Sequence, residues 1–247
     1  MTVLGVFGVL ASCLAVAASS PIKLTLSKSL NELMTEIRFE EREPEQPVSI
    51  SRILILGDRV RMDYGQDEAG FILFDGRAHV VWHVSPSDRR LTGVVAGMVG
   101  KVWAQDWNLS QEQAPSEQGV LVQVRLNGMF CSEFKAAPML HSEARLLGDF
   151  RRLLAANQAK AWLETPEEKR QPCALALDVQ AAGVEYSHGF PLAIRYWDGR
   201  SRVYQSHAYL RARPALFELP AGYARVVVSG VDQGNARSRQ PSASQER

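Results

Sequence analysis

The segment from Ser49 to Ala96 constrains the fold more than any other part of the chain, because short apolar runs in it are separated only by turn signals. The turn signals are Gly57-Asp58, Asp75-Gly76 and the run from Ser85 to Asp88. No stretch between the runs is long enough to hold a crossover helix. The segment therefore predicts five consecutive strands in an antiparallel meander and argues against a parallel α/β sheet.

The hairpin around Asp75-Gly76 has the strongest turn signal, because a type I′ turn requires positive φ at both central positions. A two-residue turn would place Phe74 opposite Arg77. Strand alternation then assigns to the core face Phe71, Leu73, Ala78, Val80, Trp82 and Val84. The opposite face carries Ile72, Phe74, Arg77, His79, Val81 and His83. This second face is too apolar to meet only water, so we expect another element or a ligand to cover it.

One amphipathic helix is predicted from His141 to Leu163, capped by Ser142 and stopped before Thr165-Pro166. Its apolar stripe consists of Leu147, Phe150, Leu154 and Ala161. The polar face is assigned Arg145, Arg151, Arg152 and Lys160. A single helix cannot build a helical domain, so we expect it to cover the apolar second face of the sheet.

Further strands are predicted from alternating or apolar runs at 36–40, 120–126, 192–197 and 202–209. Ile37 and Phe39 alternate with charged residues, which predicts an exposed or edge strand. The segment 97–119 is rich in Gln, Ser and Asp and predicts a loop. The fold class is therefore mainly β (α+β), a curved antiparallel sheet or unclosed β-barrel with one long covering helix.

The two ends of the chain differ from the rest in composition. Residues 1–20 carry no charged side chain and end in small residues, which is typical of a secretory signal peptide. An alternative interpretation is a lipobox at residues 10–13, in which a lipidated Cys13 would tether the protein to a membrane. Residues 21–230 are expected to form a single domain, and the polar residues 231–247 a disordered tail. We therefore expect a periplasmic protein.

Cys131 and Cys173 form an even pair once the signal peptide is removed. In an exported protein such a pair predicts a disulfide, here closing a loop of about 43 residues. An alternative in which Cys131 is a nucleophile with His141 as its base is much weaker.

Charge and motifs exclude several function classes. The chain has 28 Lys and Arg against 27 Asp and Glu, without a basic cluster, which argues against nucleic acid as a partner. It contains no nucleophile elbow, nucleotide-binding loop or zinc-protease motif. His79 and His83 cannot chelate one ion, since residues four apart on a strand are about 13 Å apart. We expect no enzymatic activity, no cofactor and no metal.

Two motifs, Phe71 to Asp75 and Leu216 to Tyr223, resemble the LolA/LolB-like superfamily of exported bacterial proteins, in an uncharacterised branch. The resemblance spans residues 30–226, and the segment from Cys131 to Cys173 looks like a local elaboration. It implies an antiparallel sheet that curls into an unclosed barrel, with helices over its concave apolar face. Carriers of this superfamily bind the acyl chains of lipoproteins.

The leading hypothesis is therefore a non-enzymatic periplasmic protein that binds an apolar or lipid-like ligand between the sheet and the helix. The expected ligand-binding residues are Ile72, Phe74, His79, Val81, His83, Phe150 and Leu154. An alternative is an envelope protein-interaction or assembly factor whose cavity is filled by its own side chains. A hydrolase that uses Cys131 or a histidine cluster ranks last. The first two hypotheses differ in whether the second face of the sheet is open or packed.

Overall fold

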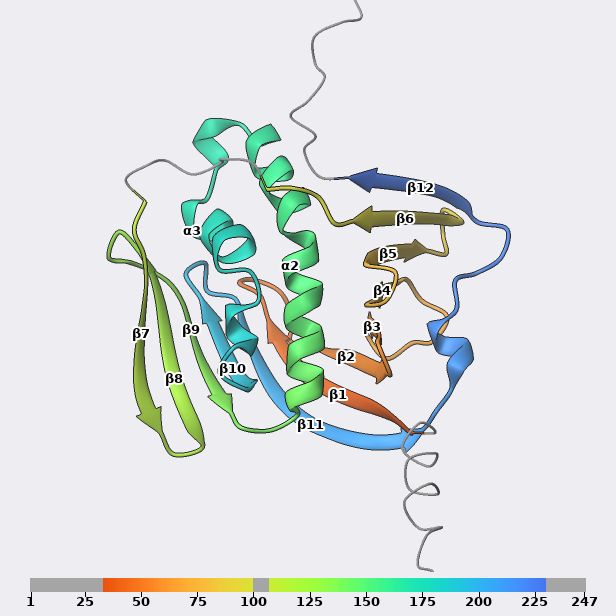
Figure 1. Ribbon diagram of the computed structural model, residues 1–247, viewed down its shortest axis with the longest axis horizontal. Coiled ribbons are helices and arrows are strands. Elements are labelled where there is room, and N and C mark those ends of the chain that lie inside the picture. Colours follow the sequence, from red (N-terminus) through yellow and green to blue (C-terminus); the bar gives the residue numbers. More distant parts are fainter. Residues whose placement is uncertain (1–32, 100–106, 230–247) are drawn as a thin grey trace, which may run out of the picture.

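The computed structural model describes residues 33–99 and 107–229, which form one sheet and a group of helices (Figure 1). The strands are β1 (Leu33–Arg42), β2 (Ser49–Leu56), β3 (Arg59–Asp63), β4 (Phe71–Asp75), β5 (Val80–Ser85), β6 (Arg90–Val95), β7 (Leu109–Ser116), β8 (Gly119–Leu126), β9 (Met129–Ala137), β10 (Phe190–Tyr196), β11 (Ser201–Arg211) and β12 (Ala224–Ser229). The helices are α2 (His141–Glu164) and α3 (Pro172–Leu175), with short helical turns η1 (Glu167–Lys169), η2 (Ala176–Gln180), η3 (Val184–Tyr186) and η4 (Pro214–Phe217). The predicted signal peptide, Cys13 and the tail 231–247 lie outside the described residues.

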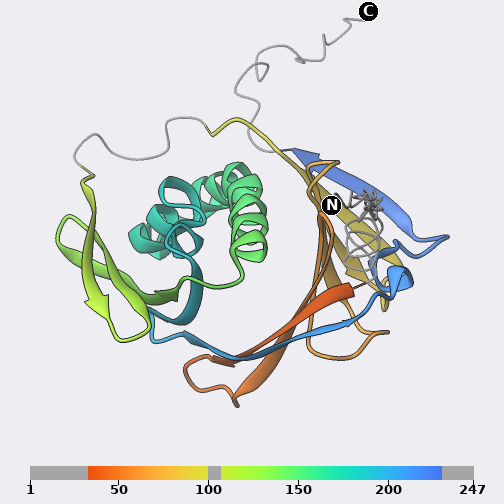
Figure 2. The same ribbon diagram turned by 60° about the horizontal axis from the view of Figure 1, so that its bottom comes forward.

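The twelve strands form one unclosed sheet in the order β12-β6-β5-β4-β3-β2-β1-β11-β10-β9-β8-β7. Figure 2 shows that the sheet curls around α2 and α3, which lie on its concave side. The predicted fold class is therefore confirmed. One pair departs from the antiparallel pattern, because β12 runs parallel to β6. β12 reaches this place through residues 212–223, which lead from β11 in the middle of the sheet to the edge beside β6.

That connection crosses the convex face of the sheet and carries η4. Leu216 and Phe217 of η4 are buried there with side chains of five strands, namely Met34, Leu54, Phe71, Leu73, Val84 and Leu91. The motif from Leu216 to Tyr223 thus begins by closing a small core on the outer side of the sheet.

The predicted register of the β4–β5 hairpin is wrong. Phe74 lies opposite Val81, not Arg77, because residues 76–79 form a four-residue loop. The Asp75 carboxylate accepts hydrogen bonds from the backbone N–H groups of Arg77 at 3.0 Å and Ala78 at 2.9 Å, and His79 ends the loop at φ +49°. Asp therefore starts an Asx turn here, not a type I′ turn. The shift is an even number of residues, so the face assigned to each residue of β4 and β5 is preserved.

The face predicted to need a cover is packed against α2. Phe74 and Val81 share a core with Leu147, Phe150 and Leu153 of the helix. The helix spans residues 141–164, as expected, and ends where the Thr165 hydroxyl donates to the Ala161 carbonyl oxygen at 2.8 Å. Its predicted cap is wrong. The N-cap is Leu140, in a left-handed conformation, and the Ser142 hydroxyl instead donates to the Glu143 carboxylate.

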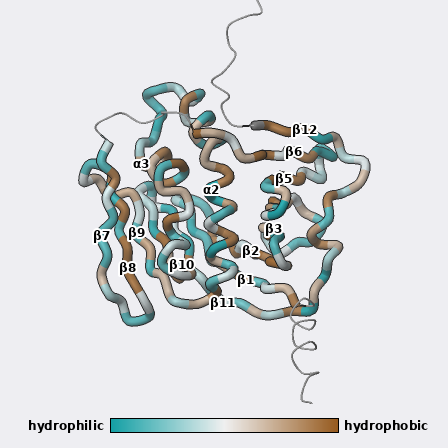
Figure 3. The backbone as a smooth tube through the Cα atoms, viewed as in Figure 1, coloured by the Kyte–Doolittle hydropathy of each residue, from teal (hydrophilic) through white to brown (hydrophobic). Residues whose placement is uncertain are grey.

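Two strand assignments also need correction. β1 is not an edge strand, because it lies between β2 and β11 with Ile37 and Phe39 fully buried. Alternation of apolar and polar residues shows that one face of a strand is buried, but it does not show whether the strand is central or at an edge of the sheet. The predicted loop at 97–119 contains β7, which forms one edge of the sheet beside β8. Figure 3 shows β7 in the colours of hydrophilic residues, as suits an edge strand that meets solvent.

The predicted disulfide is present. Cys131 of β9 and Cys173 of α3 are bonded, with their Cα atoms 5.1 Å apart. Both side chains are buried in a second core formed by strands β8 to β10 and the turn η2. The bond therefore attaches the short helices to the part of the sheet farthest from β12.

Candidate functional site

The centre of the concave face is filled by side chains, and pockets open at either end of β1. A core of fourteen buried residues, which includes Ile37, Phe39 and Phe74, occupies the space between the sheet and α2. One pocket, of about 570 Å³, meets β1 at Leu33 and Thr35, and a second, of about 460 Å³, meets it at Glu41 and Arg42. The two pockets therefore border the filled core from opposite ends of β1.

The larger pocket, here called the hairpin pocket, lies beside the first two turns of α2. It is lined by Leu33, Thr35, Ile55, Gly57, Asp58, Phe74, Gly76, Arg77, His79, Ser142, Glu143, Arg145, Leu146 and Asp149. Arg77 and Asp58 form an ion pair across its rim at 2.6 Å, with both side chains largely exposed. Such exposed pairs contribute little stability, and the pocket is a mostly polar depression between two hairpin loops.

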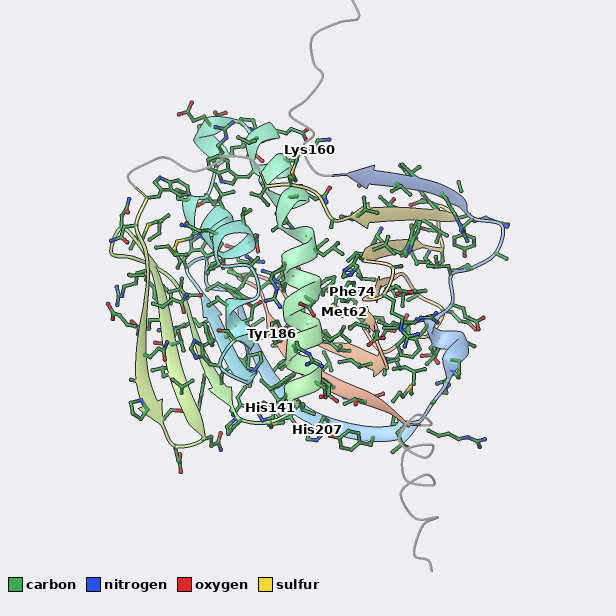
Figure 4. The ribbon with its side chains drawn as sticks, viewed as in Figure 1. Met62, Phe74, His141, Lys160, Tyr186 and His207 are labelled. Atoms are coloured by element: carbon green, nitrogen blue, oxygen red, sulfur yellow. A yellow bond between two sulfur atoms is a disulfide. The ribbon has the colours of Figure 1, made fainter. Side chains whose placement is uncertain are left out.

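The smaller pocket, here called the arginine pocket, has two chemically different walls. Its full lining is Glu41, Arg42, Glu43, Met62, Ile72, Phe150, Arg151, Leu154, Glu185, Tyr186, Tyr196, Arg200, Ser201 and Arg202. The apolar wall consists of Met62, Ile72, Phe150 and Leu154, and the polar wall of Arg151, Glu185, Tyr186, Tyr196 and Arg202. Figure 4 shows Met62 and Tyr186 on opposite sides of the α2 ribbon.

Arg151 anchors the polar wall to the helix. Its Nη2 donates to Asp178 Oδ1 at 2.7 Å. Its Nε lies 3.2 Å from Glu185 Oε1, close enough for an ionic contact, but it is buried and not aligned for a hydrogen bond. Burial by itself would lower the pKa of the Arg151 guanidinium, but the charges of Glu185 and Asp178 outweigh it and raise the pKa above its ordinary value. Arg151 is therefore a permanent cation at this site.

Arg202 is the second cation of the wall and is contributed by β11. Its Nη2 and Nε lie 2.8 Å and 3.0 Å from Glu41 Oε1. Its guanidinium stacks on the ring of Phe39, 4.4 Å from the ring centroid. Burial opposes its charge, but Tyr186 and Glu41 raise its pKa above the ordinary value. The stacking leaves the edge of the guanidinium plane available for hydrogen bonds.

Tyr186 and Tyr196 complete the wall. Neither hydroxyl makes a hydrogen bond to another residue in the described part of the chain. Burial raises the pKa of both phenols, and the nearby Arg202 and Arg151 charges only partly oppose this. Both phenols are therefore protonated at neutral pH and can donate hydrogen bonds.

The expected ligand-binding residues are distributed over several places. Ile72, Phe150 and Leu154 line the arginine pocket. Phe74 and His79 line the hairpin pocket, although Phe74 is only 1% exposed. Val81 is 4% exposed and belongs to the filled core. His83 is exposed and lines neither pocket.

The whole polar wall escaped the sequence analysis. Helical periodicity places Arg151 on the polar face of the helix, away from the apolar stripe. The other members come from η3, β10 and β11, and no local spacing connects them. The one usable signal is alternation in β11, which places Arg202 and Tyr204 on one face.

Two further properties concern the described residues. Within 33–99 and 107–229, no group of three His, Cys, Asp or Glu side chains is arranged to hold a metal ion. No helix of that part of the chain has both the length and the apolarity needed to cross a bilayer.

Comparison with known proteins shows only a distant similarity between the fold of this chain and several solved structures. No family model and no curated protein matches the chain. An uncharacterised conserved protein from Thermus thermophilus is 13% identical, with a TM-score of 0.39, over 84% of this chain and 97% of that chain. PNGF-II is 9% identical, with a TM-score of 0.36, over 80% of this chain and only 31% of that chain.

A LolA superfamily protein from Nitrosomonas europaea is also similar. It is 8% identical, with a TM-score of 0.29, over 76% of this chain and 90% of that chain. Similarities at this level concern the fold alone and carry no conclusion about function. The expected resemblance to the LolA/LolB-like superfamily therefore has weak structural support, limited to the fold.

Proposed function

We propose that this protein is a non-enzymatic periplasmic binder of an apolar or lipid-like ligand, and that the ligand occupies the arginine pocket. The observation that supports this most is the apolar wall of that pocket, to which the sheet contributes Met62 and Ile72 and the helix Phe150 and Leu154. The pocket volume of about 460 Å³ lies within the range of roughly 300–1,000 Å³ found for small-molecule sites.

The apolar wall has surface left to bury. Met62, Ile72 and Leu154 are only partly buried, whereas the core residues behind them are closed to solvent. An aliphatic chain on this wall would remove that surface from water, at about 25 cal/mol of stabilisation for each Å² of apolar area. The hairpin pocket offers less, because Ile55 and Phe74 of its apolar lining are already buried.

The proposal is tested by uptake of the neutral fluorescent probe N-phenyl-1-naphthylamine. Leu154→Asn is expected to weaken uptake about tenfold, because it puts a polar amide against the chain. Leu146→Asn is the matched control, since Leu146 is a partly buried leucine of the same helix that lines the hairpin pocket. Melting temperatures of both variants separate loss of binding from unfolding.

Two results would contradict the proposal. One is a purified protein that takes up no probe at all. The other is a Leu146→Asn variant that loses uptake while Leu154→Asn keeps it, which would place the ligand in the hairpin pocket.

A second candidate, an envelope protein-interaction or assembly factor with a self-filled cavity, is favoured by the packed centre of the concave face. Phe74 and Val81 are buried there against α2. This candidate predicts that Leu154→Trp, which fills the arginine pocket, leaves function in the cell intact. The binding proposal predicts that the same substitution blocks probe uptake while the protein stays folded.

A further inference from the structure

The polar wall of the arginine pocket has hydrogen-bond donors without acceptors. Arg151 and Arg202 contact their carboxylates through Nη2 and Nε, and neither Nη1 group makes a hydrogen bond within the described part of the chain. The hydroxyls of Tyr186 and Tyr196 also make no hydrogen bond to another described residue. Glu185 is the carboxylate at the centre of the wall, and its Oε1 already faces Arg151. The free donors of the wall therefore outnumber its acceptors, because Glu185 is its one carboxylate.

A purely structural role explains only part of this arrangement. The pairs Arg151–Asp178 and Arg202–Glu41 link elements of the fold, as ion pairs commonly do. The two phenols have no such task, because removing either hydroxyl would break no hydrogen bond to a described residue. Neither hydroxyl is among the buried side-chain atoms of the described residues that lack a partner, so both reach the solvent of the pocket. There they can donate to a ligand that accepts hydrogen bonds.

The two walls also adjoin in a way that suits an amphiphile. Phe150 and Arg151 are consecutive in α2, and Leu154 follows one turn later. On the sheet side, the Arg202 guanidinium lies on Phe39, next to the buried core. A polar head and the aliphatic chain attached to it can therefore contact the two walls at once.

We propose that the polar wall binds the oxyanion head of an amphiphilic ligand, a carboxylate or a phosphate at the end of an aliphatic chain. The head accepts hydrogen bonds from the free Nη1 groups of Arg151 and Arg202 and from the hydroxyls of Tyr186 and Tyr196. Guanidinium groups favour such heads because their planar N–H donors match two oxygens of one anion. This inference rests on the proposed function, since it identifies the head of the same ligand.

The test compares four amphiphiles with the same ten-carbon chain: decanoate, decyl phosphate, decanol and decyltrimethylammonium. Each is titrated calorimetrically into the purified protein at neutral pH, below the concentration at which it forms micelles. At least one anion is expected to bind about tenfold or more tightly than decanol, because hydrogen bonds to charged groups are the stronger ones. The tighter of the two anions identifies the head as carboxylate or phosphate.

Tyr186→Phe and Tyr196→Phe provide the residue-level test. Each is expected to weaken binding of the preferred anion about tenfold and binding of decanol by less, because a hydrogen bond to a neutral hydroxyl is weaker than one to an anion. Neither should lower the melting temperature, because no hydrogen bond to a described residue is lost. Tyr209→Phe is the matched control, since Tyr209 is exposed on β11 and lines neither pocket. Replacing an arginine is less informative, because Glu41 or Glu185 would then be left without its partner.

The outcomes separate this inference from the proposed function. Equal affinity for decanol and both anions, or a preference for decyltrimethylammonium, would overturn the oxyanion assignment and leave the ligand-binding role standing. Tyrosine variants that bind the anion as tightly as the unmodified protein would also overturn it. If none of the four compounds binds, the proposed function itself fails.

Discussion

Asp63→Asn is expected to be among the most destabilising single substitutions on the convex side of the sheet. The Asp63 carboxylate accepts hydrogen bonds from Arg52 Nε at 2.8 Å, Arg52 Nη2 at 2.9 Å and Arg61 Nε at 2.7 Å. It also accepts one from the Gly65 backbone N–H at 2.8 Å. The side chains of Asp63, Arg52 and Arg61 are 0%, 10% and 3% exposed, so the cluster is screened from water.

The magnitude follows from this burial. Removing one member of a buried ion pair costs about 3–5 kcal/mol, because the remaining charge stays desolvated without a partner. Asp63→Asn does this to Arg61, whereas Arg52 keeps its contact with Asp67. Arg61 also donates to the Leu216 carbonyl oxygen at 2.9 Å, so its displacement would loosen η4. We expect a loss of about 3–5 kcal/mol, which is a large part of a typical unfolding free energy of about 5–15 kcal/mol.

The assay is urea unfolding followed by tryptophan fluorescence, with Asp67→Asn as the control. Asp67 also contacts Arg52, at 2.7 Å, and Arg213, at 2.8 Å, but its side chain is 32% exposed. Solvent screening should limit its loss to about 1 kcal/mol. If the two variants lose equal stability, burial does not set the strength of this cluster and the reasoning is wrong.

Three further predictions concern stability. Burial alone would raise the pKa of the Asp63 carboxyl, but hydrogen bonds from Arg52 and Arg61 outweigh it and hold the pKa below its ordinary value. Hydrogen bonds from Arg52 and Arg213 likewise lower the pKa of Asp67. The two carboxylates therefore stabilise the folded protein fully above their unfolded-state pKa of about 3.9, and this stabilisation is lost as the pH falls through their lower folded-state pKa values. Urea unfolding midpoints measured at several pH values would show this loss. Replacing Cys131 and Cys173 by Ser should cost about 4 kcal/mol, whereas a thiol label that reacts with the native, unreduced protein would refute the disulfide. Leu147→Ala, in the core under α2, should cost about 2–5 kcal/mol, and a loss below about 1 kcal/mol would show that this core is loosely packed.

The central hairpin shows how a correct fold can come from a partly wrong argument. Asp75-Gly76 does mark a turn, but the Asp75 side chain bonds to the next backbone N–H groups and lengthens the loop to four residues. Arg77 and His79 consequently leave the sheet and lie in the loop. The faces of Ile72, Phe74 and Val81 were still predicted correctly, because side-chain alternation does not change when the register shifts by an even number.

The polar edge strand β7 could not be found from hydrophobic periodicity, because most of its side chains are exposed to solvent. Its backbone pairing with β8 places it in the sheet. The central place of β1 was hidden for a related reason. Its outward face carries Glu36, Arg38 and Glu40, as an edge strand would. Its backbone pairs with the next strand, β2, on one side, but its partner on the other side is β11, which is distant in sequence.

Local chemistry in the sequence determined most strands, the positions of the turns, the covering helix and the cysteine pair, because periodicity, turn residues and thiol count act within a few residues or follow from composition. The arginine pocket was decided by tertiary structure alone. Arg151, Tyr186 and Arg202 belong to α2, η3 and β11, and they meet only because the curled sheet brings β11 beside β1 and under the helix. Side-chain charges act through space, so their partners depend on the folded distance and not on their separation along the chain.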